Sequence, residues 1–150
     1  MALLLQLLLL IHVFAAMYWF GASAGVPRRV REALAGDVHR ARAAFASLAR
    51  DAKLFMAAGV LVFLTGLGMA LIRGFAMLPP RLHAGLGLTV IWLGIGLGVL
   101  RPTMQKIGAA VATSDSIPDT TVPLRKRVAM WMGIQHLLFT VITVLMLWRI

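Results

Sequence analysis

The side chains best suited to chemistry in this 150-residue chain are its histidines. His12, His83 and His136 lie in or at the ends of long apolar runs, whereas His39 lies in a charged segment. An ionisable ring in hydrocarbon is costly unless it has a partner, so intramembrane histidines mark candidate sites. Neutral imidazole is a common axial ligand of haem iron, and helix bundles build cofactor sites from facing side chains. The pattern therefore indicates a buried cofactor site in a membrane protein.

The composition restricts which metal chemistry is available. The chain has no cysteine, which excludes thiolate ligands, iron–sulfur clusters and cysteine-attached haem. Its five acidic residues all lie between the apolar runs, so a carboxylate site inside the membrane is excluded as well. The nine methionines would suit Cu(I), but they are scattered without a Met-x-x-x-Met ladder. Copper transport is accordingly the weaker alternative.

Four apolar runs have the length that a membrane helix needs. About 20 residues at 1.5 Å each cross the hydrocarbon core, and backbone groups there must be satisfied within a helix. The first run follows no Lys or Arg, so it is taken as a retained helix although Ala22-Ser23-Ala24 resembles a cleavage site. We expect an all-α membrane protein, one integral domain over residues 1–150, with a four-helix bundle at residues 2–25, 54–72, 82–100 and 128–148.

Basic residues predict the orientation of the bundle. Of the 15 Lys and Arg residues, seven lie between the first two runs and five between the last two. The positive-inside rule then places both long connections in the cytoplasm and both termini outside, in a membrane such as the bacterial inner membrane. The net charge of +10 is thus explained by the orientation in the membrane and by contact of the basic residues with anionic lipid headgroups. A nucleic-acid partner is not expected, because no stacking aromatics accompany the basic residues.

The connections and small residues predict how the helices are arranged. Apolar residues recur every three or four positions from Arg28 to Lys53, which predicts a cytoplasmic amphipathic helix lying on the membrane surface, divided at Gly36-Asp37. Residues 101–127, which contain three prolines, are expected to form an irregular loop. The short connection 73–81 predicts a tight antiparallel pair of helices 2 and 3, packed through glycine stripes.

Counting residues from the outer surface places two imidazoles at similar depths. His12 lies about 15 Å down and His136, counted from Trp148, about 18 Å down. This spacing suits one haem b held between helices 1 and 4, with His12 and His136 as the metal ligands. His83 would lie about 15 Å from that pair, where it could bind a second haem, contact a propionate together with Arg81 or Arg73, or face water.

The first helix resembles that of a known family. His12, Trp19 and Pro27-Arg28 are similar to the pattern in HemJ-type protoporphyrinogen IX oxidases and the related CopD proteins, which are four-helix membrane proteins. Leu64-Thr65-Gly66-Leu67 and Leu82-His83-Ala84 extend the likeness to helices 2 and 3. The resemblance implies haem b binding, with His12 as ligand and Trp19 and Arg28 beside the cofactor. Gly85 stands where that family has lysine, and Trp131 to His136 replaces its Asn-Glu-Pro element.

These observations lead to four hypotheses about function. The first is a haem b-binding protein that passes electrons to a quinone, a respiratory acceptor or a larger membrane complex. The second is the protoporphyrinogen IX oxidase itself, against which Gly85 counts because lysine could position porphyrin carboxylates. The third is a non-enzymatic accessory subunit of a membrane assembly, and the fourth is copper transport. The lipid bilayer is a partner in every case, and a homo-oligomer is left open.

Overall fold

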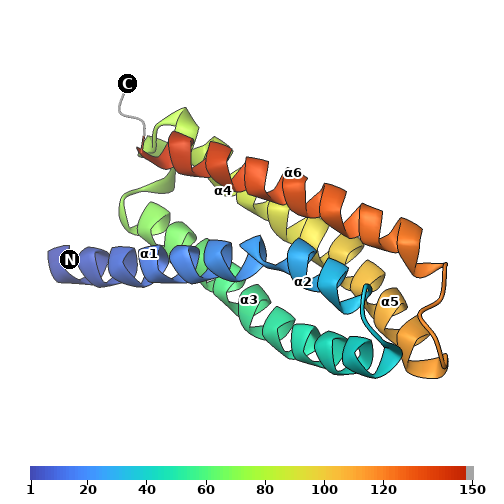
Figure 1. Cartoon of the computed structure of the whole chain (residues 1–150). Helices are drawn as coiled ribbons and strands as arrows, with labels where there is room; N and C mark the ends of the chain where they lie inside the picture. Colours follow the sequence, from blue (N-terminus) through green and yellow to red (C-terminus); the bar gives the residue numbers. More distant parts are fainter. Residues whose placement is uncertain (148–150) are drawn as a thin grey trace.

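Four helical rods, antiparallel along the chain, make up the fold of the computed structural model, which describes residues 1–147 (Figure 1). The predicted end of the last helix at Trp148, and Arg149, lie outside this range. A short 3-10 turn, Phe75–Met77, lies in the connection between the second and third rods. The other elements in chain order are α1 (Ala2–Ala24), α2 (Val26–Ala33), α3 (Val38–Ile72), α4 (Pro80–Ile95), a π-helical turn (Gly96–Leu100), α5 (Arg101–Thr113) and α6 (Thr121–Leu147).

All four rods are long and apolar enough to cross a membrane, which confirms the predicted class and the four spans. The rods Ala2–Ala33, Val38–Ile72, Pro80–Thr113 and Thr121–Leu147 contain 32, 35, 34 and 27 residues. A helix of about 20 residues already crosses the hydrocarbon core. Every rod therefore extends beyond its apolar run, and the extensions carry most of the arginines. We call the half of the bundle made of residues 26–53 and 101–127 the basic end.

The structure does not confirm a separate amphipathic helix on the membrane surface. The predicted break is present: α2 ends at Ala33, and the Asp37 side chain caps α3 by accepting a hydrogen bond from the Arg40 backbone N–H. The first half of the segment continues α1, however, and the second half forms the first turns of α3 (Figure 1). Its apolar stripe is buried against α5 and α6 instead of lipid, because those helices offer a complementary apolar face.

The predicted irregular loop over residues 101–127 is wrong, because most of it is helical. Pro102 lies inside the continuous rod Pro80–Thr113, and the π-helical turn directly before it accommodates the ring and the missing N–H. Thr103, Ile107 and Val111 form a buried stripe with a helical period, which the prolines obscured. Only residues 114–120 connect α5 to α6 without a helix.

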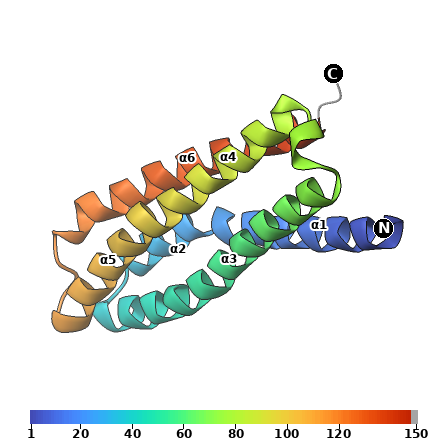
Figure 2. The same cartoon turned by 180° about the vertical axis from the view of Figure 1, so that it is seen from behind.

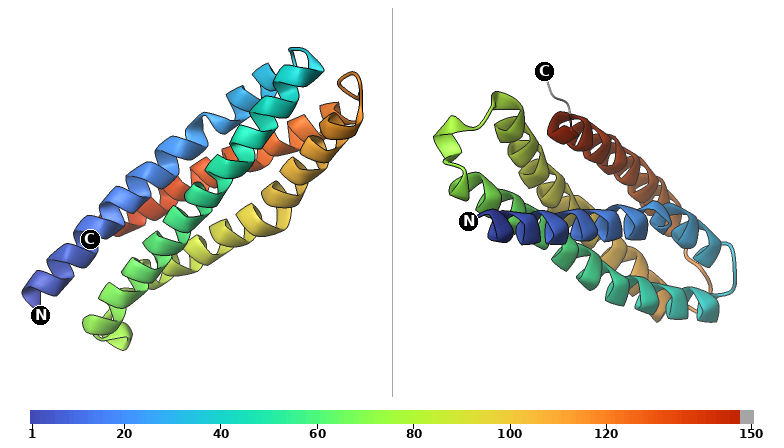
Figure 3. Two further views of the ribbon diagram at one scale, coloured as in Figure 1. Left: turned by 90° about the horizontal axis from the view of Figure 1, so that it is seen from below. Right: turned by 90° about the vertical axis from the view of Figure 1, so that its left-hand side faces the viewer.

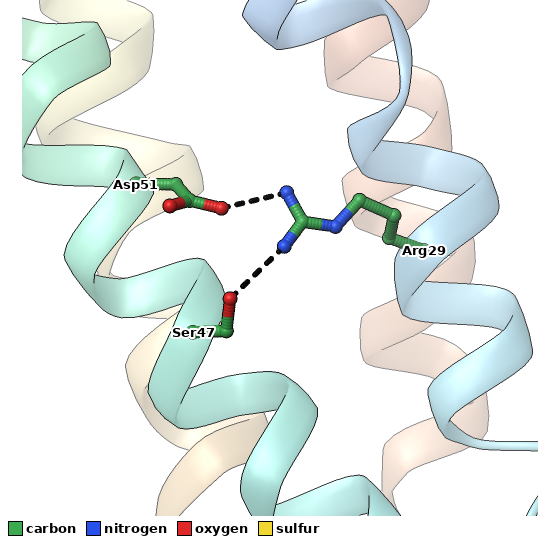
Figure 4. Close-up of polar contacts among 3 residues, drawn as sticks. All are labelled: Arg29, Ser47 and Asp51. Carbon is green, nitrogen blue, oxygen red and sulfur yellow. Dashed lines mark hydrogen bonds and ion pairs between the residues drawn. The ribbon is translucent and has the colours of Figure 1, made fainter.

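The basic end contains most of the larger of the two clusters of buried apolar residues. Val30, Ile107 and Val111 are fully buried there, and Arg29 of α2 donates to Asp51 and Ser47 of α3 at 2.7 and 3.2 Å (Figure 4). The opposite half carries leucines, valines and phenylalanines on its outer surface, most densely along α1. A protein surface that faces lipid is apolar, whereas a protein segment in water buries its apolar side chains in a core. The basic end is built as a bundle that can stand outside the hydrocarbon.

The glycines pack differently from the prediction, which paired helices 2 and 3. The α3 helix packs mainly on α1, and α4 packs mainly on α6 (Figures 2 and 3). A Cβ at Gly59 of α3 would lie 2.8 Å from the Trp19 ring of α1, whereas a Cβ at Gly94 of α4 or at Gly98 of the π-helical turn would have no neighbour within 4 Å among the described residues. The predicted contact between α3 and α4 is present in part: a Cβ on Gly66 would lie 3.7 Å from Leu86, and one on Gly96 would lie 3.2 Å from Met56. It is not the main contact of either helix. Gly59 makes room for an indole ring instead.

The fit of Trp19 against Gly59 predicts a specific destabilisation. Gly59→Ala should lower protein stability by about 1–3 kcal/mol, because a rigid, buried ring must move to admit the methyl group. Gly133→Ala is the matched control: it introduces the same methyl group where nothing lies within 4 Å and should leave stability equal or slightly raised. Thermal unfolding in detergent, followed by circular dichroism, measures both variants. Equal midpoints for the two would contradict the packing.

The cap of α3 predicts a pH dependence. The hydrogen bond from the Arg40 backbone N–H lowers the pKa of the exposed Asp37 carboxyl below its usual value. A lowered pKa means that the cap stabilises the fold above the ordinary value of about 3.9 and loses this effect as pH falls through the folded value. Asp37→Ala should lower the thermal midpoint at neutral pH, with a difference that shrinks below about pH 4. Serine is a cap without a charge, so the difference in midpoint between Asp37→Ser and Asp37→Ala should stay the same as pH falls. A difference between the unmodified protein and Asp37→Ala that does not change with pH would contradict the role of the carboxylate.

Candidate functional site

His12 of α1 is half-buried and is held by a hydroxyl on α3. Its Nδ1 lies 2.9 Å from Oγ1 of Thr65, and that hydroxyl donates to the Leu61 carbonyl at 2.7 Å. Because a threonine hydroxyl has one proton, Thr65 accepts from His12, so the proton of the imidazole is assigned to Nδ1. The Nε2 atom of His12 then keeps its lone pair. The neighbouring Gly66 leaves space for this ring, since a Cβ there would lie 3.3 Å from Cε1 of His12.

His136 of α6 has the same kind of partner on α1, with its ring nitrogens in the opposite roles. Its Nε2 lies 3.0 Å from Oγ of Ser23, and Ser23 donates to the Phe20 carbonyl at 2.7 Å. The proton is therefore assigned to Nε2, and Nδ1 keeps the lone pair. The Phe20 ring lies edge-on to the imidazole at 5.5 Å between centroids. Each of these two intramembrane histidines thus satisfies one nitrogen through a hydroxyl that is itself bound to its own helix.

The predicted meeting of the two imidazoles at one level is wrong. His136 contacts α1 at Ser23, which lies eleven residues beyond His12, or about 16 Å along the helix. Two axial ligands of one iron must bond to it directly from opposite faces, which this separation does not allow. The depth count failed because it treated the start of α1 and the end of α6 as level. Figure 1 shows α1 extending beyond the C-terminal end of α6.

The remaining predicted site residues also lie apart from one another. His83 is half-buried near the start of α4, with the Phe75 ring edge-on at 4.7 Å between centroids. Arg28 is exposed and forms an ion pair with Glu32 at 2.7 Å. Trp19 is 2% exposed, and its Nε1 has no hydrogen-bond partner among residues 1–147. That Nε1 would lie 2.9 Å from a Cβ on Gly59, so the indole N–H faces the α3 backbone closely enough to leave no room for a cofactor between them.

A pair of polar groups missed by the sequence analysis joins α4 to α6. Trp92 Nε1 donates to the Gln135 carbonyl and Gln135 Nε2 donates to the Trp92 carbonyl, each at 3.0 Å. Gln135 is fully buried, and its Oε1 accepts no hydrogen bond from the part of the chain that the structure describes. A glutamine inside an apolar run was the available signal, because a side-chain amide in hydrocarbon needs an internal partner. The pair fixes the register of the two helices.

The described residues contain no ready-made metal centre. Within residues 1–147 no three His, Cys, Asp or Glu side chains lie close enough together to hold a metal ion. Protein-family models, curated proteins and solved structures were compared with the chain, and none of them matches it. The chemistry of the site therefore has to be argued from the two histidines and their hydroxyl partners.

The hydroxyl partners predict the tautomer of each histidine. In Thr65→Val the side-chain partner of His12 Nδ1 is lost and the Val62 backbone carbonyl is left as the acceptor near this ring, so the preference for one tautomer should weaken, while His136 is unchanged. Ser23→Ala should do the reverse, which makes each variant the control of the other. Nitrogen-15 chemical shifts of the labelled imidazole rings measure the protonated nitrogen. A His12 ring carrying its proton on Nε2 in the unmodified protein would contradict the assignment.

Proposed function

We propose that this chain is a haem b-binding integral membrane protein that transfers electrons, with His12 as the axial ligand. The observation that carries the proposal is the chain of hydrogen bonds from His12 Nδ1 through Thr65 to the Leu61 carbonyl. Metal-ligating histidines almost always donate their second ring N–H to a fixed acceptor, which sets the tautomer and aims the free nitrogen. His12 meets this condition without a metal, and the likeness of His12 and Trp19 to the HemJ and CopD pattern points to the same residue.

The ligand set of the proposal contains one histidine. His12 and His136 are too far apart along α1 to share an iron, so a haem gripped by both rings does not fit these residues. A single imidazole is a sufficient protein ligand in several classes of haem protein. Haem, when bound, supplies one-electron chemistry, while the protein holds the ligand ring and sets its surroundings. Thr65 holds that ring, and Gly66 leaves the space that it needs.

The depth of His12 is consistent with a partner dissolved in the lipid. Its contact residue Thr65 lies twelve residues beyond Lys53, where the charged part of α3 ends, which is about 18 Å into a core of about 30 Å. We place the basic end in the cytoplasm on the positive-inside rule. A cofactor on His12 would then lie near the middle of the bilayer, where a quinone or a membrane-bound acceptor can approach.

Oxidase activity is not part of the proposal. Gly85, which replaces the lysine of the HemJ pattern, is buried against α6: a Cβ there would lie 2.6 Å from Cε of Met146. A tight helix contact therefore occupies the position from which a cation could hold porphyrin carboxylates. The competing function is that of an accessory subunit without a cofactor. The absorption spectrum of the purified protein distinguishes this function from haem binding.

The test is the absorption spectrum of protein purified from haem-replete cells. The proposal predicts a Soret band that His12→Ala abolishes, while His136→Ala, which removes the other histidine bound to a hydroxyl of a neighbouring helix, preserves it. Thr65→Val keeps the ligand but frees its second nitrogen, so haem affinity should fall about 10–100-fold. A colourless protein that co-purifies with stoichiometric partners would establish the accessory role instead. A band that survives His12→Ala would remove His12 as ligand.

A further inference from the structure

A long groove runs between α3 and the rod formed by α4 and α5. Figure 2 shows the course of these helices. Its volume is about 1120 Å³, and its walls are overwhelmingly apolar. Along α3 it extends from Arg42 to Leu64, a distance of about 33 Å, and along the other wall from Gly96 to Ala112. Neither His12 nor His136 lines it. We call it the lateral groove; it is separate from the proposed haem ligand.

The charges around the lateral groove are all positive. Its lining includes Arg42, Lys53 and Arg101 and contains no Asp or Glu. Arg42 is already engaged, since its guanidinium donates to the carbonyls of Val111 and Ser114 at 3.1 and 2.8 Å. Lys53 and Arg101 are exposed, and neither forms an ion pair within residues 1–147. These two cations are the ones available to an anionic ligand.

The position of Lys53 and Arg101 matches the boundary of the hydrocarbon. Lys53 immediately precedes the apolar run of α3, and Arg101 immediately follows that of α4 and the π-helical turn. From Lys53 to Leu64, at the inner end of the lateral groove, is eleven residues or about 16 Å, which is half of a hydrocarbon core of about 30 Å. The inner part of the groove is therefore as long as one leaflet is thick, with two cations at the level of the headgroups.

These properties favour a lipid over a second copy of the chain. A two-fold dimer through this face would bring the same cations of both copies together without any carboxylate between them. A soluble anion would leave the apolar walls exposed. An acyl chain would cover the apolar walls, and a phosphate would pair with the cations. Each cation near an anionic surface contributes about fivefold in affinity.

We propose that the lateral groove is a binding site for an anionic phospholipid of the membrane. Its acyl chains lie along the inner half, from Met56 to Leu64 on the α3 side and at Gly96 and Leu97 on the other. Its phosphate lies between Lys53 and Arg101, and its headgroup faces the outer half of the groove toward Gln105. The site is independent of haem binding at His12.

The experiment uses the full-length protein in nanodiscs made from an equimolar mixture of phosphatidylglycerol and phosphatidylcholine. After mild release, native mass spectrometry counts the lipids that remain bound. We expect retained phosphatidylglycerol in preference to phosphatidylcholine, and a loss of about tenfold or more in Lys53→Gln/Arg101→Gln. Arg50→Gln/Lys106→Gln is the matched control: it removes one cation from α3 and one from α5 that are exposed but do not line the groove.

A second variant tests the apolar part of the site. Ala57→Trp fills the inner half of the lateral groove from an exposed position, so it should displace the lipid while leaving the fold and its thermal midpoint intact. Equal retention of both lipids, or equal loss in the control pair, would overturn the proposal. The proposal would also be overturned if the unmodified protein formed a dimer that Ala57→Trp dissociated without changing lipid retention. A second copy of the chain would then occupy the groove.

Discussion

Hydrocarbon offers no hydrogen bonds, so a polar side chain within the spans is stabilised by a partner inside the bundle. His12 binds Thr65, His136 binds Ser23, and Trp92 and Gln135 bind each other's carbonyls. Each of these contacts joins two different helices. The same few polar groups therefore tie α1 to α3, α1 to α6 and α4 to α6, in a region where apolar side chains gain little by leaving lipid for one another.

This requirement also explains why the two histidines are separate. A hydroxyl that donates to its own helix has a lone pair left, and one such hydroxyl satisfies one imidazole N–H without a charged group. Each ring therefore has its hydrogen bond in a different helix–helix contact, and no interaction between the two rings is required. What remains on each ring is one unprotonated nitrogen. The proposed ligand role of His12 depends on that nitrogen, whereas the lateral groove depends on the cations at the membrane boundary.

The basic end shows how one pattern can be satisfied in two ways. An apolar stripe among arginines can lie on a membrane surface or against other helices. Here α5 and the start of α6 present matching stripes, so the segment forms a closed core with them, and the arginines turn outward or bind carbonyls, as Arg42 does. The bundle thus continues past the boundary marked by Lys53 and Arg101, and the lateral groove continues with it.

Sequence patterns were enough to predict an all-α membrane protein, the four spans, the break at Gly36-Asp37 and the histidines that would need partners. These follow from hydropathy and local propensity, which are properties of a segment on its own. The tertiary structure decided which partner each polar group took, the levels of His12 and His136, the contact of Gly59 with Trp19, and the helical state of residues 101–113. Those depend on how far each rod extends and which rod it packs against, and a one-dimensional count of residues from the membrane surface contains neither quantity.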